Sequence, residues 1–107
     1  MTVTVPAMRV LIRPEARKDL SDASAWYDNQ GPGLGLSFLT AVRQQLLQIR
    51  SRPEAFPPFH RQTRRALIKR FPYGVIFLVQ AEQERIIVIA VLHCGRDPRL
   101  WRARSQV

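Results

Sequence analysis

Cysteine and histidine are scarce in this chain. Its 107 residues include one cysteine, Cys94, and two histidines, His60 and His93. A single cysteine excludes an intrachain disulfide, which fits a reducing compartment such as the cytoplasm. The three residues form no paired ligand motif of the kind that holds zinc. We therefore expect neither a metal site nor a cofactor.

Acidic residues and long apolar runs are also few. Eight Asp and Glu stand against seventeen Lys and Arg, which gives a net charge of +9. Such an excess attracts polyanions or acidic proteins. The longest apolar runs have the length of a strand, well below the roughly 20 residues that span a bilayer. The N-terminal residues lack the features of a signal peptide. These absences predict a cytoplasmic protein without membrane association.

The length predicts one domain with a single modest core. Residues 1–7 are expected to be an N-terminal extension, because the segment from Met8 reads like a natural protein start. Whether Met1 or Met8 is the native start stays open. The domain then covers residues 8–107 and ends in a basic C-terminal tail, with four arginines between Arg96 and Arg104.

Two amphipathic helical patterns follow a short β-prone run at residues 10–12. The first begins at Pro14 and stops near Asn29, and the second ends before Pro53. The Gly- and Pro-rich turn between them predicts an antiparallel αα-hairpin. We expect their apolar side chains in the core: Ala16, Leu20, Ala23, Trp26 and Tyr27 from the first, and Leu36, Leu39, Val42, Leu46 and Ile49 from the second.

Three β-rich runs occupy the last third, at residues 66–71, 75–79 and 86–92. The run 86–92 is the most apolar and predicts a buried central strand. The order β-α-α-β-β-β predicts an α+β fold, with the hairpin packed on one face of a small, mainly antiparallel sheet. The other face of the sheet would then be left to solvent or to a partner.

Three strings carry a family resemblance: RPEARKDLSDASAWYDNQGPGLGLSFL, RRALIKRFPYGVIFLV and IIVIAVLHCGRDPRLW. From Met8 to Arg102 the chain resembles the ParE/RelE superfamily of bacterial type II toxins. The FPYG turn and the HxGRDPRxW ending look like the ParE branch. The resemblance implies a RelE/ParE-like fold, a plasmid-stabilisation type of system and a cognate antitoxin that forms a hetero-oligomer with the toxin.

The two branches of this superfamily do different work. ParE-like toxins poison DNA gyrase by binding it, whereas RelE-like toxins cleave messenger RNA on the ribosome. RelE-like chains usually carry a catalytic arginine after the tyrosine of the turn, where this chain has Gly74, and a tyrosine in the tail, where it has Trp101. Both departures favour gyrase binding without catalysis. The expected target-binding residues are Arg65, Lys69, Arg70, Arg96, Arg99 and Trp101.

Two alternatives remain open from the residues. A ribosome-dependent ribonuclease, with the ribosome and mRNA as partners, would draw its cation and its proton-transfer groups from Arg65, Lys69, Tyr73, His93 and Arg96. A non-toxic binding module could keep the fold without the activity, because fold alone does not determine function.

Overall fold

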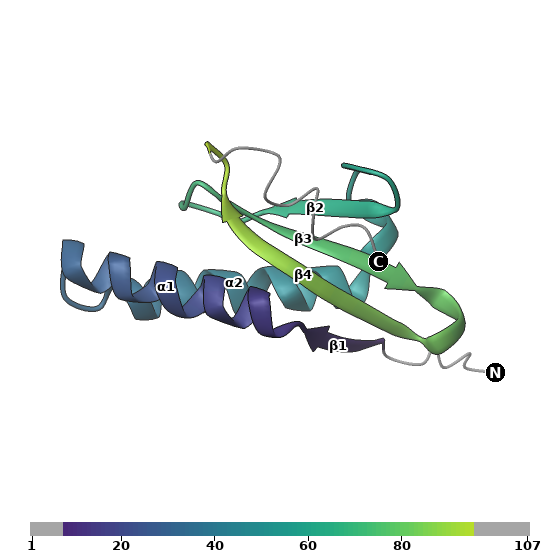
Figure 1. The fold of residues 1–107 in the computed structure, drawn as a ribbon, viewed down its shortest axis with the longest axis horizontal. Coiled ribbons are helices and arrows are strands. Elements are labelled where there is room, and N and C mark those ends of the chain that lie inside the picture. Colours follow the sequence, from purple (N-terminus) through teal and green to yellow (C-terminus); the bar gives the residue numbers. More distant parts are fainter. Residues whose placement is uncertain (1–7, 96–107) are drawn as a thin grey trace.

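The predicted order of elements is confirmed in a computed structural model, which describes residues 8–95 (Figure 1). The N-terminal half forms β1 and two helices, and the C-terminal half forms a three-stranded meander. None of the helices in the described range is long and apolar enough to cross a membrane. The elements are β1 (Arg9–Ile12), α1 (Pro14–Gln30), α2 (Leu34–Ser51), the 3₁₀ turn η1 (Pro53–Ala55), β2 (Thr63–Leu67), β3 (Tyr73–Gln80), the 3₁₀ turn η2 (Ala81–Gln83) and β4 (Arg85–His93).

The four strands form one mixed sheet in the order β1-β4-β3-β2. β4 is central, as its apolar β-branched sequence predicted. It pairs with β3 antiparallel and with β1 parallel, and the β1 pairing ends at Ile12 opposite Val88. The β3–β4 register shifts between Ile76 and Phe77, so β4 carries one extra residue there. Such a bulge changes which β4 side chains face the helices.

The helical hairpin is built around two glycines with different tasks. Gly33 has φ 82°, a left-handed conformation that glycine adopts without steric cost. Gly35 lies at a close approach of the two helices, since an added Cβ would be 2.6 Å from the carbonyl oxygen of Ser24. The amide of Gly35 donates a hydrogen bond of 2.8 Å to Asp28 Oδ1. Asp28 therefore caps α2 from the neighbouring helix.

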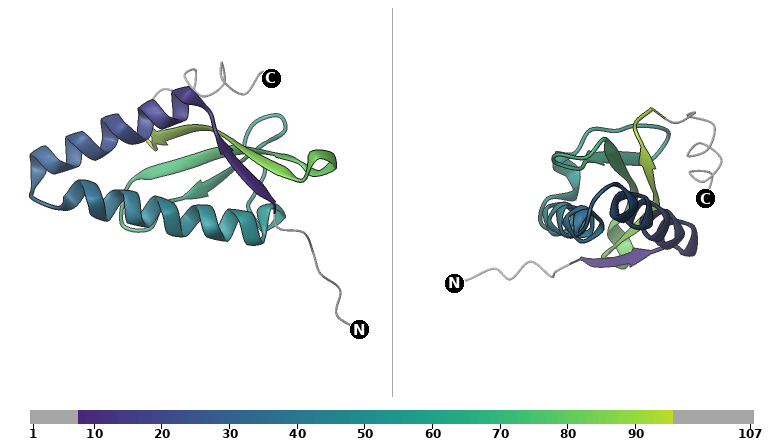
Figure 2. Two further views of the ribbon diagram at one scale, coloured as in Figure 1. Left: turned by 90° about the horizontal axis from the view of Figure 1, so that it is seen from below. Right: turned by 90° about the vertical axis from the view of Figure 1, so that its left-hand side faces the viewer.

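Both helices lie on the same side of the sheet (Figure 2). The main core fills this interface, and its largest fully buried side chains include Phe38, Ile49 and Phe77. The opposite face of the sheet differs from the expectation of an open surface. Its apolar side chains form a second buried cluster, against which Phe59 packs: Ile76, Leu78, Ile87, Ile89, Ala90 and Leu92.

The expected core was wrong at three positions on the helices. Trp26 is 55% exposed, Leu36 is 70% exposed and Leu39 is 39% exposed. On α2 the sheet instead covers Phe38 and residues on the same face of the helix. The apolar residues of α2 spread over more than one face, and helical periodicity alone does not say which face meets the sheet.

Candidate functional site

The five cations between Arg61 and Arg70 do not form one patch. Arg64 is structural, because its Nη1 donates hydrogen bonds to the backbone carbonyls of Glu54 and Phe56. Arg65 and Leu67 lie on the face of β2 that points away from the helices, opposite Ala66. β2 ends at Leu67, so Lys69 and Arg70 belong to the turn before β3. The β-rich run expected at residues 66–71 is therefore corrected to a strand that begins at Thr63 and ends at Leu67.

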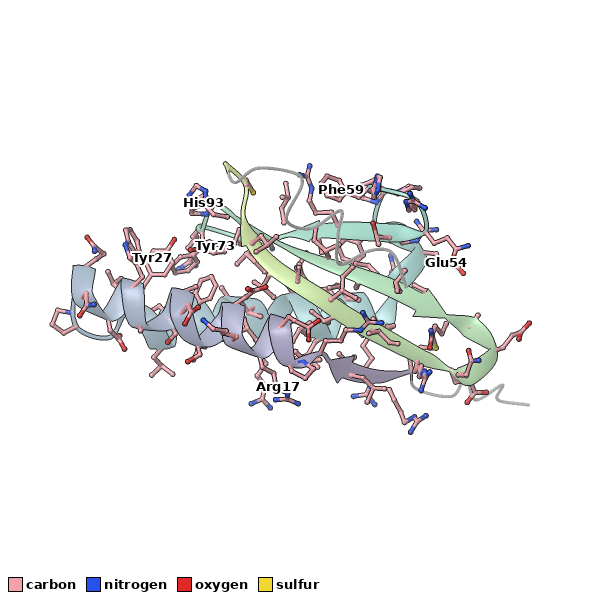
Figure 3. All side chains as sticks on the ribbon, viewed as in Figure 1. Arg17, Tyr27, Glu54, Phe59, Tyr73 and His93 are labelled. Carbon is pink, nitrogen blue, oxygen red and sulfur yellow. The ribbon has the colours of Figure 1, made fainter. Side chains whose placement is uncertain are left out.

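Arg65 is held across two strands. Its guanidinium carbon lies 4.3 Å from the centre of the Phe59 ring, a cation–π geometry. Its aliphatic stem runs over Gly74 on β3, where an added Cβ would come within 3.2 Å of the Arg65 Cγ and Cδ atoms. Because Gly74 has no side chain, the Arg65 stem has room to lie over it. Phe59 lies above β2, far from the helices (Figure 3).

Lys69 and Arg70 are exposed and stand beside α2. They line a groove of about 530 Å³ together with Leu34, Leu36 and Phe71. Leu36, which was expected in the core, therefore adjoins two of the predicted target-binding cations. An apolar floor with cations on one rim suits an amphipathic segment that carries acidic residues.

Tyr73 and His93 lie at the opposite end of the sheet from η2, close to Tyr27 of α1 (Figure 3). Tyr73 and His93 are cross-strand partners, and their rings meet edge to face at 5.3 Å. The Nδ1 atom of His93 accepts a hydrogen bond of 2.9 Å from the amide of Gly95. Neutral His93 therefore carries its proton on Nε2. The half-buried Tyr73 ring also contacts Phe38 and Tyr27.

A cavity of about 540 Å³ opens beside these rings, between α1 and the ends of β3 and β4. Sequence reasoning missed its acidic wall, which consists of Asp19 and Asp22. Asp19 Oδ2 accepts a hydrogen bond of 3.0 Å from the Val91 amide, a contact between residues 72 positions apart. Asp19 lies four residues after Glu15, and Asp22 lies four residues before Trp26, so the sequence placed them on one helix face. Nothing in the sequence placed β4 against that face.

Two pKa values on α1 are displaced from their ordinary ranges. The hydrogen bond and the charge of Asp22, 2.8 Å from the Lys18 Nζ, raise the pKa of Lys18. Burial raises the pKa of Tyr27, and the neighbouring Tyr73 adds to the shift. Tyr27 therefore remains a neutral hydrogen-bond donor through the physiological pH range.

The residues predicted from the sequence fall into three separate places. Arg65 lies on the sheet face away from the helices, Lys69 and Arg70 lie beside α2, and Tyr73 and His93 line the cavity beside α1. Arg96, Arg99 and Trp101 lie outside the described residues. Between residues 8 and 95, no cluster of three or more His, Cys, Asp or Glu side chains could hold a metal ion.

The model of a protein family described as the ParE toxin of the parDE type II toxin–antitoxin system matches residues 10–98. No curated protein sequence matches the chain. A structure of the chromosomal ParDE system from P. aeruginosa superposes with a TM-score of 0.71 and 19% identity, over 81% of this chain and 96% of that chain.

Two further solved structures share the fold. The toxin–antitoxin complex RelBE2 from Mycobacterium tuberculosis gives a TM-score of 0.61 at 19% identity, over 82% of this chain and 99% of that chain. A free mutant of E. coli RelE, with two arginines replaced by alanine, gives a TM-score of 0.65 at 16% identity, over 84% of this chain and 86% of that chain. The RelE/ParE-like α+β fold expected from the sequence is thereby confirmed.

Proposed function

Because the chain belongs to the ParE toxin family of type II toxin–antitoxin systems, we propose that it arrests growth by binding DNA gyrase. The family match covers residues 10–98, most of the chain. In this proposal the toxin traps gyrase without turning over a substrate. A cognate antitoxin binds the toxin and holds it inactive until the toxin is released from the complex.

The separation of the candidate residues is the observation that supports binding over catalysis. Cleaving RNA through its 2′-hydroxyl requires a general base, a general acid and a cation around one phosphate. Tyr73 and His93 line a different cavity from Lys69, and Arg65 lines neither. A binding surface needs no such convergence, because cations spread over a surface still steer and hold an acidic partner.

The surroundings of Gly74 add to this support. The stem of Arg65 fills the space above Gly74, and its guanidinium is engaged by the Phe59 ring. A side chain at position 74 would compete for the same space. Packing therefore fixes the position of the Arg65 guanidinium on this face of the sheet, and a fixed cation suits a specific contact with a partner.

The antitoxin is proposed to occupy the groove beside α2. Leu34 and Leu36 supply an apolar floor, and Lys69 and Arg70 supply two exposed cations at its rim. An amphipathic antitoxin segment with acidic residues would bury the leucines and pair with the cations. Covering the same cations that contact gyrase would explain neutralisation by direct competition.

The test compares two assays on the same purified protein. Gyrase-dependent DNA supercoiling and cleavage are measured with increasing toxin, and messenger cleavage is measured on isolated ribosomes. Gyrase inhibition without messenger cleavage supports the proposal. Messenger cleavage with unaffected gyrase would replace it with the RelE-like activity.

Matched charge variants locate the surface. Replacing Lys69 and Arg70 with glutamine should weaken gyrase inhibition by about tenfold, since each removes a contact cation. The control replaces Arg17 and Arg50, which are exposed on the helices, and removes the same charge. Figure 3 shows Arg17 on the side of α1 that points away from the sheet. Equal losses in both variants would indicate a general charge effect and reject the assigned surface.

Two other functions are distinguished by expression of the chain alone. A soluble protein that causes no growth arrest would indicate a non-toxic binding module. Arrest with an immediate stop in translation would indicate the ribonuclease. Arrest with filamentation, a DNA-damage response and continuing translation is the result expected for a gyrase poison.

A further inference from the structure

The cavity beside α1 has no part in the proposed gyrase contact, yet aromatic rings line it in a row. Trp26 and Tyr27 meet edge to face with ring centres 5.0 Å apart. Tyr27 and Tyr73 are 6.0 Å apart, and Tyr73 and His93 are 5.3 Å apart. Trp26 at the rim is 55% exposed, although tryptophan is highly buried on average. An aromatic wall with an exposed rim is typical of a site that a partner covers.

The charge of this cavity is opposite to that of the chain. Asp19 and Asp22 line it, in a protein whose net charge is +9. Asp22 forms an ion pair with Lys18, but both side chains are mostly exposed, at 66% and 76%. Ion pairs at such exposure are weak, so an incoming cation can share or replace Lys18. An anionic ligand would be repelled here, whereas a cation is attracted by the negative charge of the two carboxylates.

Beyond Val88 the edge of β4 faces α1 instead of a strand, and Ile89 to Leu92 are buried. β1 pairs with β4 only as far as Val88, so among the described residues Ile89 to His93 have no strand neighbour on that side. The carboxylate of Asp19 on α1 accepts the hydrogen bond of the Val91 amide, which a neighbouring strand would otherwise accept. Val91, Leu92 and His93 at the end of this edge line the cavity opposite α1.

We propose that this cavity binds an arginine side chain on the surface of a partner protein. A guanidinium stacks on the faces of Trp and Tyr and pairs with carboxylates through parallel hydrogen bonds. The cavity offers both kinds of contact at once, from Trp26 and Tyr27 on one wall and from Asp22 beside them. The proposal does not depend on gyrase being the target.

The experiment titrates the isotopically labelled full chain with N-acetyl-arginine-N-methylamide and follows two-dimensional NMR spectra. The Trp26 indole signal and the amides of Val91 and His93 should shift and saturate. The citrulline analogue has the same shape without the charge, and it should bind about tenfold more weakly, because the cation–π and ion-pair contacts are lost.

Two exposed positions test the assignment without disturbing the core. Asp22→Asn and Trp26→Leu should each weaken arginine binding by about five- to tenfold. Glu82→Gln, an exposed carboxylate in η2, removes the same charge as Asp22→Asn and should leave binding unchanged. The spectra themselves report whether each variant is folded. Equal binding of arginine and citrulline, or no saturable shift up to about 50 mM, which corresponds to negligible affinity, would overturn the proposal.

Discussion

Replacing Gly35 with alanine should destabilise the domain, although alanine is the better helix former. Gly35 lies in the first turn of α2, against α1. Its added Cβ would be 2.6 Å from the Ser24 carbonyl oxygen and 2.6 Å from Asp28 Oδ1. A backbone oxygen inside a helix cannot withdraw as a flexible side chain can. The helices must therefore separate, or the Asp28 cap must break.

The expected magnitude follows from three contributions. Overpacking against atoms that cannot move costs about 1–3 kcal/mol. Loss of the Gly35–Asp28 hydrogen bond costs about 1 kcal/mol more. The higher helix propensity of alanine returns at most about 1 kcal/mol. The net loss is about 2 kcal/mol, which lowers the Tm of a domain of this size by about 10 °C.

The assay is thermal and urea unfolding of Gly35→Ala beside Gly33→Ala. Gly33 has open space around its Cβ position but a φ of 82°, so its substitution introduces backbone strain without a clash. That strain costs about 1 kcal/mol. Gly35→Ala should therefore be the more damaging change. An unchanged or higher stability of Gly35→Ala would refute the close helix contact on which this reasoning depends.

Substitutions at three further positions test individual contacts. Asp19→Ala leaves the Val91 amide without its acceptor and should cost about 1–3 kcal/mol in urea unfolding, whereas Asp19→Asn keeps an oxygen acceptor and should cost less. Arg64→Met removes the hydrogen bonds to the carbonyls of Glu54 and Phe56 but keeps the apolar stem, so limited proteolysis between η1 and β2 should become faster while the core stays folded. Burial raises the pKa of Tyr27 above its ordinary value of 10.0, so the unfolded state releases this proton first and stability falls as pH rises past about 10. Tyr27→Phe should show a smaller loss of Tm between about pH 9 and pH 11, and an equal loss in both proteins would contradict the burial.

Local patterns predicted most of the secondary structure. Pro14 and the Gly-rich turn bounded α1, and the β-branched run of β4 indicated a central strand. These signals act over a few residues, through backbone conformation and hydrophobic periodicity, so a single sequence carries them. The resemblance of the chain to a toxin family added the overall fold, and the comparisons with known proteins confirmed it.

The sequence predicted less well which side chains of the helices and which face of the sheet are buried. Leu36 and Phe38 are both apolar residues of α2, but only Phe38 is buried. The second cluster around Ile89 was expected to be an open face. Each outcome depends on which surfaces meet in the folded chain, and the sequence holds no distances between elements far apart along it.

The element order and the excess of positive charge followed from the sequence alone. Only the tertiary structure separated Arg65, Lys69 and Tyr73 into three places. It also brought Asp19 of α1 to Val91 of β4 and so formed an acidic, aromatic cavity in a basic protein. The physical reason is that strand pairing and helix packing join residues distant in the chain, whereas periodicity and composition report only on neighbours.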